Sequence, residues 1–268
     1  MLCYLGMSEA KLRHLALILD GNRRWGKQRG IPMSVDFYIK SGLLGLDIAQ
    51  AVFDRGIDKF TIWIGSVSNL TERPALELKA LNKVYKKFFT DKENLDFLHE
   101  RKIWVNCVGR WRELLEPDTV QAIQSTLDAV HKYHNSGKIL TVLVGYDGRE
   151  ERGAALQKIL STIGDIYMSD DETAKSDFFD KELPQNLGGT KDTADTLRAN
   201  SWTGYLPDVD LTIRTGAGKD PHNSAGFLSL LSDNTQYAFV ETLWPDFTPE
   251  MLNDIVDDFE NRERRMGK

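Results

Sequence analysis

Six short apolar runs, rich in β-branched residues, recur along the chain without strict alternation of polar and apolar positions. They span residues 15–19, 60–64, 103–108, 139–144, 209–213 and 237–240. Such runs are typical of strands buried on both faces. Apolar residues at helical spacing lie between several of them, within residues 39–53, 78–88, 120–130 and 155–163. The alternation predicts an α/β fold with a mostly parallel central sheet covered by helices, and each apolar stripe is expected to face the core.

The length of 268 residues suits one large α/β domain, so we expect residues 1–268 to form a single domain. Residues 1–12 are expected to be a flexible N-terminal extension. Residues 168–182 are acidic and poor in large aliphatic side chains, which indicates a mobile excursion rather than a domain boundary.

Composition and charge narrow the classes of protein. A hydrophobic content of 41% and a charged content of 28% are typical of a globular protein. The net charge of −6 argues against general nucleic-acid binding. Cys3 and Cys107 form neither a zinc pattern nor a disulfide framework. No run has the length of a transmembrane helix and no signal peptide is recognised, so we expect a cytoplasmic protein without a transmembrane segment.

The first candidate site directly follows the strand predicted at residues 15–19. Residues 20–30 are interpreted as a loop that holds Asp20 and four cations, Arg23, Arg24, Lys27 and Arg29. Ligands bind beyond the carboxyl ends of strands in open α/β sheets. Arginines bind phosphate oxygens, a glycine lets the backbone approach them, and a carboxylate holds Mg²⁺. This loop therefore indicates a diphosphate site with a metal ion, with a solvated basic turn as the alternative.

A second candidate site follows the strand predicted at residues 209–213. Arg214, two nearby glycines and Lys219 again place cations at a strand end. The segment is not a nucleotide-binding P-loop, because the glycine spacing is wrong and Asp220 replaces the Ser or Thr. The glycines are equally well explained as turn residues, whereas a buried strand end rarely carries an arginine without a partner.

Six segments in the same order as in one family give the chain a specific resemblance. The chain resembles the cis-prenyltransferases, the undecaprenyl diphosphate synthase family, over most of its length. The six segments, with the family patterns they resemble, are residues 20–25 (DGNxRW), 69–74 (N[WL]xxRP), 145–151 (NYGGRxE), 207–216 (PDxDLxIRTxG), 243–247 (LWPDF) and 262–267 (RxRRFG).

The resemblance implies roles for individual residues of this chain. Asp20 would be the catalytic carboxylate that binds Mg²⁺, and Asn69 would lie beside the reacting carbons. The residues expected to bind the allylic diphosphate are Gly21, Asn22, Arg23, Arg24 and Arg73. The residues expected to bind a second diphosphate are Arg214, Ser224, Arg265 and Gly267. The resemblance of the last two to a terminal tail that reaches a partner subunit implies a homodimer.

Departures from the family pattern concentrate on the second diphosphate site. The loop 216–226 is longer than in the family and carries Lys219, His222 and Ser224 but no arginine. Gln236 stands where the family has a metal-binding glutamate, and a neutral amide is a weaker Mg²⁺ ligand. An arginine and a Gly-His pair of the family are missing from residues 31–38. We therefore expect an eroded isopentenyl diphosphate site beside a nearly intact allylic site.

The leading hypothesis is a Mg²⁺-dependent prenyltransferase that ionises an allylic diphosphate of five to fifteen carbons and makes a short isoprenoid. Its expected substrates are dimethylallyl, geranyl or farnesyl diphosphate, with isopentenyl diphosphate as a further candidate. The eroded second site makes an irregular or cyclised product more plausible than in an ordinary family member. The alternatives are a terpene cyclase acting on one prenyl diphosphate and a non-catalytic accessory subunit. The retained Asp20 argues against the accessory subunit.

Overall fold

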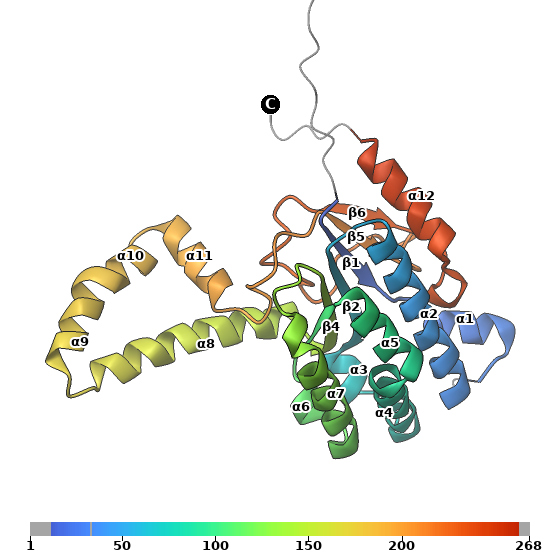
Figure 1. The fold of residues 1–268 in the computed structure, drawn as a ribbon, viewed down its shortest axis with the longest axis horizontal. Coiled ribbons are helices and arrows are strands. Elements are labelled where there is room, and N and C mark those ends of the chain that lie inside the picture. The colour runs from blue at the N-terminus through green and yellow to red at the C-terminus, as the bar shows by residue number, and fades with distance from the viewer. Residues whose placement is uncertain (1–11, 33, 263–268) are drawn as a thin grey trace, which may run out of the picture.

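The core of the molecule is a six-stranded sheet in the order β3-β4-β2-β1-β5-β6 (Figure 1). In this computed structural model, residues 12–32 and 34–262 are described, apart from the side chain of Lys40. All neighbouring strands are parallel. The strands are β1 (His14–Ile18), β2 (Lys59–Ser66), β3 (Trp104–Val108), β4 (Ile139–Tyr146), β5 (Leu211–Arg214) and β6 (Gln236–Phe239). All six strands predicted from the apolar runs are confirmed.

The central strands are apolar throughout because both faces of the sheet are covered. In β1, Leu15 and Leu17 belong to one core cluster, while Ala16 and Ile18 belong to the cluster on the opposite face. Successive side chains of a strand point to opposite faces, so burial of both faces removes the polar alternation.

Helices cover the first face, and a mostly irregular segment covers the second. The first core cluster includes side chains of α2 (Val35–Asp54), α4 (Ala75–Thr90), α5 (Lys92–Arg101), α7 (Pro117–Val130) and α12 (Pro249–Glu260). On the second face, Leu206, Val209, Phe227 and Leu231 pack against the sheet from turns and loops. Shorter helices complete the body: α1 (Asn22–Arg29), α3 (Val67–Thr71), α6 (Trp111–Leu114) and the 3₁₀ turns His131–Tyr133 and Trp244–Asp246.

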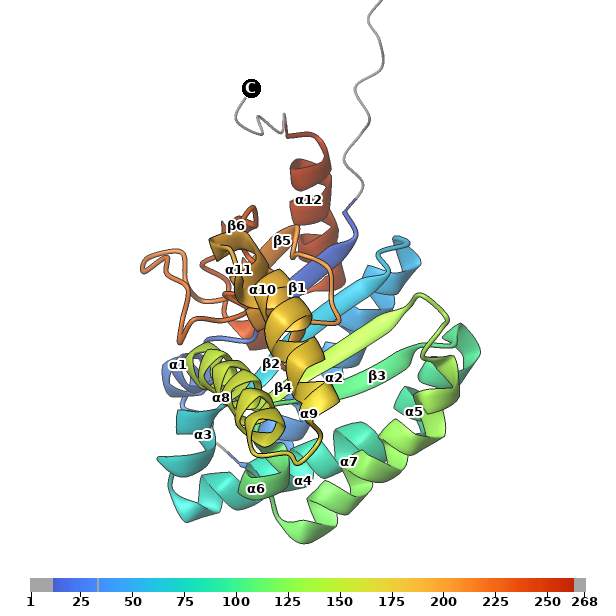
Figure 2. The ribbon, with the colours of Figure 1, turned by 90° about the vertical axis from the view of Figure 1, so that its left-hand side faces the viewer.

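A helical arm projects from this body (Figures 1 and 2). It consists of α8 (Gly148–Tyr167), α9 (Glu172–Asp177), a π-helical turn (Phe178–Glu182), α10 (Leu183–Leu187) and α11 (Thr190–Ala199). The excursion expected at residues 168–182 is therefore mostly helical. The expectation that the stripe in residues 155–163 faces the core is wrong for most of its length. Ala155 is fully buried, but Leu156 is 51% exposed and Ile159 and Ile163 are only half-buried, because α8 leaves the sheet after its first turns.

A buried histidine at the start of β1 makes the stability of the fold depend on pH. The ring of His14 is hydrogen bonded to the Pro207 carbonyl through Nδ1 (2.9 Å) and to Thr61 Oγ1 through Nε2 (2.8 Å). Since a carbonyl can only accept, Nδ1 carries the proton and Nε2 accepts from the Thr61 hydroxyl. Burial lowers the pKa of His14 to about 4, so the folded protein holds a neutral imidazole.

We expect this histidine to destabilise the protein in acid. Its contribution is fully present above the unfolded-state pKa of about 6.5 and is lost as the pH falls towards the folded-state pKa. The loss amounts to about 3 kcal/mol between pH 6.5 and 4. Urea unfolding at pH 7, 5.5 and 4 measures it, with His14→Gln as the comparison. An equally steep decline in that variant would show that other groups cause the acid sensitivity.

Candidate active site

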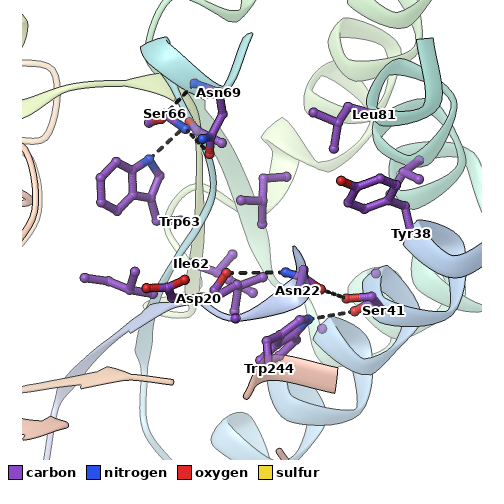
Figure 3. A pocket seen from close by; sticks show the side chains of 18 of the residues that line it. Asp20, Asn22, Tyr38, Ser41, Ile62, Trp63, Ser66, Asn69, Leu81 and Trp244 are labelled. Carbon is purple, nitrogen blue, oxygen red and sulfur yellow. Dashed lines mark hydrogen bonds between the residues drawn. The ribbon is translucent and has the colours of Figure 1, made fainter. Parts of the chain in front are cut away.

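The carboxyl ends of three adjacent strands, β2, β1 and β5, open into one cavity of about 320 Å³ (Figure 3). Its mouth is polar, and apolar side chains of α4 and β2, among them Leu81 and Ile62, line its interior. The predicted site residues that line it are Asp20, Gly21, Asn22, Arg23, Arg24, Asn69, Arg73, Arg214 and Ser224. The structure thus brings together two motifs almost two hundred residues apart, because β1 and β5 pair in parallel.

The segment interpreted as a basic loop is instead the helix α1, Asn22–Arg29, so the loop interpretation is wrong beyond Gly21. Gly21 turns the chain at φ 111°, and a Cβ there would lie 2.8 Å from Leu243 Cδ2. Arginine, lysine and glutamine are good helix formers, which explains the helix that follows. No side chain of the described residues caps the first amides of α1. A helix N-terminus with free amides attracts anions. The helix therefore favours a phosphate site here more strongly than the loop expected from the sequence.

Asp20 is held in place through its backbone, and its carboxylate lies between two arginines. Its backbone amide donates to Thr215 Oγ1 (2.9 Å), and its carbonyl accepts from the amide of Trp244 (3.0 Å). Its carboxylate contacts Arg214 Nη2 at 2.9 Å and Arg24 Nη2 at 3.1 Å. The side chain is still 35% exposed, so a ligand at the cavity mouth can reach it.

Arg214 is the most deeply buried charged group at the mouth, with a side chain 9% exposed. Its Nη1 donates to Ser224 Oγ (2.7 Å) and to the His222 carbonyl (2.8 Å). These bonds fold the long loop after β5 back over the cavity. Its Nε is buried without a hydrogen-bond partner among the described residues. Burial of an unpaired charged donor is costly.

A second arginine with the same property stands on the other side of the mouth. Arg73 Nη1 donates to the Tyr38 hydroxyl (3.3 Å), and Glu77 lies 3.9 Å from the same nitrogen. Arg73 Nε is also buried without a partner in the described part of the chain. Burial raises the pKa of Tyr38, so its hydroxyl stays protonated at neutral pH.

Asn22 and Asn69 are both oriented by hydrogen bonds to neighbouring residues. Asn22 Oδ1 accepts from Ser41 Oγ (2.5 Å), and the Ser41 carbonyl accepts from Trp244 Nε1 (2.9 Å) (Figure 3). Asn69 Oδ1 accepts from the Ser66 amide (3.3 Å) in the capping box of α3.

The structure does not place some of the residues singled out from the sequence at the cavity. Arg265 and Gly267 lie outside the described residues, as do residues 1–11 of the expected N-terminal extension. Gln236 begins β6, next to Leu211, whereas Asp20 follows the far end of β1, which pairs with Arg214. The Gln236 carboxamide accepts from Arg262 Nη1 at 3.1 Å. Gln236 and Asp20 therefore face different ends of the sheet.

The sequence interpretation missed the aromatic residues that shape the cavity. Tyr38, Trp63, Tyr85 and Phe88 all line it. Phe88 was interpreted as part of an apolar stripe that faces the core, and Trp63 as part of a buried strand. A usable signal was the presence of two glycines, Gly42 and Gly45, inside the helix α2. Glycine costs about 1 kcal/mol in a helix interior, so such residues often have a packing or functional reason.

The residues present fit a magnesium ion that is held mainly by its substrate. Among residues 12–32 and 34–262, no group of three or more His, Cys, Asp or Glu side chains could hold a metal. Mg²⁺ keeps several waters and is commonly bound by one or two carboxylates together with substrate phosphates. The partly exposed carboxylate of Asp20, in contact with Arg24 and Arg214, is a donor set of that kind.

Comparison with known proteins identifies the class of protein. The model of the family described as "Putative undecaprenyl diphosphate synthase" matches residues 18–267. An isoprenyl transferase of Treponema denticola (strain ATCC 35405) is 31% identical over 258 residues, covering 96% of this chain and 98% of that protein. One of Brucella abortus biovar 1 (strain 9-941) is 30% identical over 256 residues, 95% of this chain and 89% of the relative. The chain belongs to the undecaprenyl diphosphate synthase family and is a prenyl diphosphate transferase.

Solved structures agree on the fold. Lavandulyl diphosphate synthase from Lavandula x intermedia, in complex with dimethylallyl diphosphate, superposes with a TM-score of 0.79 at 23% identity, covering 97% of this chain and 100% of that one. A probable undecaprenyl diphosphate synthase from Campylobacter jejuni gives 0.66 at 20% identity, covering 96% and 99%. No helix in the described part of the chain is long and apolar enough to cross a membrane.

Proposed function

We propose that this protein is a Mg²⁺-dependent prenyltransferase that ionises an allylic diphosphate of five to fifteen carbons and joins the resulting cation to an alkene. The observation that carries this proposal is the polarity of the cavity. Arg23, Arg24, Arg73 and Arg214 line its mouth, and the interior behind them is apolar. A ligand with a diphosphate head and a hydrocarbon tail matches both parts.

The residues at the cavity mouth would have different roles in the ionisation of the allylic diphosphate. Arg23, Arg24 and Arg73, with the first amides of α1, would bind the allylic diphosphate and stabilise the charge that develops on it as the carbon–oxygen bond breaks. Arg23 forms no ion pair with another described residue, so it is available to an incoming anion. Mg²⁺ held by Asp20 would supply further charge neutralisation for the leaving diphosphate. Asn69, which is bonded to Ser66 and lines the cavity, would lie beside the reacting carbons.

We further propose that the product is an irregular or cyclised short isoprenoid. Arg214, the last residue of β5, lines the cavity and is already bonded to Asp20 and Ser224, and the loop 216–226 that follows adds no arginine. Lys219 of the same loop lines a separate surface hollow with Arg29 and Glu241. A site with one arginine binds a second diphosphate less well than a site with two. The similarity in fold to a lavandulyl diphosphate synthase is compatible with this proposal.

A homodimer is also proposed. The arm carries exposed apolar side chains on α8 and at its end, with Leu160 58%, Tyr167 67% and Met168 79% exposed. Arms that pack against each other around a two-fold axis would bury these side chains in both copies. The tail with Arg265 and Gly267 would then reach the partner's site. Light scattering should give twice the mass of the chain, whereas the mass of one chain would refute the dimer.

Product analysis tests the proposed function. Purified protein with Mg²⁺ is given dimethylallyl, geranyl or farnesyl diphosphate, each with and without isopentenyl diphosphate, and the products are identified by mass spectrometry. We expect branched or cyclic products from allylic substrate alone. Longer linear diphosphates that form only with isopentenyl diphosphate would show regular elongation and refute the irregular reaction. No product from any combination would refute the transferase.

A further inference from the structure

A path of hydrogen bonds leads from the cavity to the surface through the loop after β5. Ser224 lines the cavity, and its Oγ lies 3.1 Å from His222 Nε2. On the other side of the ring, Nδ1 lies 2.9 Å from the Asp220 carbonyl oxygen and 3.3 Å from the Asp220 carboxylate. The side chain of His222 is 47% exposed, so its ring connects Ser224 to water. Ser224 and His222 thus form a relay between the cavity and the solvent.

The hydrogen bonds of the relay determine where its protons lie. A carbonyl can only accept, so Nδ1 of the neutral His222 ring carries the proton and Nε2 is an acceptor. Arg214 Nη1 can only donate, and it donates to Ser224 Oγ at 2.7 Å. The hydroxyl proton of Ser224 is therefore free to point at Nε2. Hydroxyl, unprotonated ring nitrogen and an acceptor behind Nδ1 follow in the order of a Ser-His-Asp triad, in which the histidine takes the serine proton.

The loop holds both residues of the relay in place. Arg214 Nη1 donates to the His222 carbonyl (2.8 Å) as well as to Ser224, so one buried guanidinium orients the two residues together. Ala225 lies in the left-handed region at φ 47°, and its carbonyl accepts from the amide of Gly148 at 2.9 Å. Such strain at a residue other than glycine persists where the surroundings fix the backbone, and it is concentrated at functional sites.

The coupling of two prenyl units produces a proton that has to leave the cavity. When an alkene attacks the allylic cation, its π electrons form the new carbon–carbon bond and the positive charge moves to the other alkene carbon. A neighbouring carbon then loses a proton, and the electrons of its carbon–hydrogen bond form the double bond of the product. Asp20, the one carboxylate among the described residues that line the cavity, is proposed to hold Mg²⁺. The relay and an oxygen of the released diphosphate are the remaining proton acceptors.

We infer that Ser224 and His222 accept this proton and pass it to the solvent. The inference rests on the proposed function. As the carbon–hydrogen bond breaks, Ser224 Oγ takes the proton and gives its own to His222 Nε2. The Asp220 carboxylate beside Nδ1 stabilises the imidazolium that forms. The imidazolium then loses a proton to water, which its exposed ring can reach, and the relay returns to its first state.

His222→Gln should lower kcat for the coupled product about a hundredfold, since general base catalysis contributes about 10²–10⁴-fold. Release of inorganic diphosphate from dimethylallyl diphosphate should fall much less, because ionisation precedes proton transfer and does not use the relay. KM for the second substrate should not change. Asn223→Ala is the matched control, because Asn223 Nδ2 donates to the Phe227 carbonyl (3.1 Å) in the same loop but does not line the cavity.

Three further measurements distinguish proton transfer from a structural role of His222. Free imidazole should restore activity to His222→Gly, because the site of the ring is open to solvent. Dimethylallyl diphosphate with deuterium in both methyl groups should react several-fold more slowly in His222→Gln, where proton removal becomes limiting, but not in the unsubstituted protein. Combined with Ser224→Ala, His222→Gln should cause no further loss, because both residues belong to one path.

The outcomes separate this inference from the proposed function. Full kcat of His222→Gln in a protein that makes coupled product overturns the relay and leaves the transferase standing. A raised KM for the second substrate at unchanged kcat also overturns it, since His222 would then only orient Ser224 towards a diphosphate. An equal loss in Asn223→Ala, or no rescue of His222→Gly by imidazole, assigns the proton to the diphosphate instead. Neither product nor diphosphate release from the unsubstituted protein refutes the transferase and the relay together.

Discussion

Replacement of Asp20 by asparagine should lower kcat about a thousandfold while the protein remains folded. The carboxylate is the only acidic side chain among the described residues that line the cavity. Its removal takes away the proposed Mg²⁺ ligand, and loss of a single group that stabilises developing charge already costs about 10²–10³ in kcat. The change is nearly isosteric, and the backbone bonds of Asp20 to Thr215 and Trp244 do not involve the carboxylate.

The affinity for the allylic diphosphate should not fall with turnover in the Asp20→Asn variant. Asp20→Asn frees Arg24 and Arg214 from their anionic partner, so both can turn to the diphosphate. We therefore expect the affinity for an allylic diphosphate without metal to stay the same or to increase. Titration calorimetry and steady-state turnover measure the two effects separately.

Asp246→Asn is the matched control. Asp246 accepts from Trp25 Nε1 (2.7 Å) and Arg29 Nη2 (2.8 Å) on α1, but it does not line the cavity. Its side chain is 44% exposed, and an exposed ion pair contributes about 0–1 kcal/mol, so kcat should change by less than about fivefold. Equal losses in the two variants, or full activity of Asp20→Asn, would contradict the role given to Asp20.

The strands could be predicted from the sequence because burial on both faces leaves a clear signal. The runs around Leu17, Ile62 and Val142 are apolar on consecutive positions, and few other structures require this. The apolar stripe of α8 was a poorer guide than the strand runs. Helical spacing of apolar residues does not show whether they pack against the body of the same chain or stay exposed. Leu156 was predicted to face the core and lies on the surface.

The mouth of the site was also more predictable than its interior. Asp20, Arg73 and Arg214 stand in short motifs at strand ends, and a parallel sheet brings such ends to one edge. Tyr38 and Phe88 carry no comparable signal, since an aromatic residue that lines a cavity has the same spacing as one that fills the core. Whether Asp20–Gly30 was loop or helix depended on the turn at Gly21, which local composition did not reveal.

Replacement of Arg214 by lysine should lower kcat/KM for the second substrate about a hundredfold. The guanidinium of Arg214 reaches Asp20, Ser224 and the His222 carbonyl at once. Lysine keeps the charge but lacks the planar set of donors, so it can replace only part of these contacts. A hydrogen bond to a charged group contributes about 1.5–3 kcal/mol, which corresponds to roughly 10–150-fold.

The effect should be selective, because the two arginines with free Nε donors stand on different sides of the cavity mouth. Arg73→Lys should raise KM for the allylic substrate, whereas Arg214→Lys should raise it for the second substrate. Arg110→Lys is the control: Arg110 follows β3 at the same edge of the sheet but is bonded to Glu113 and Glu150 and does not line the cavity. If Arg214→Lys raises only the allylic KM, the two diphosphate positions are reversed. If both substrates are molecules of the same allylic diphosphate, the two variants should differ instead in the substrate concentration at which the second molecule binds.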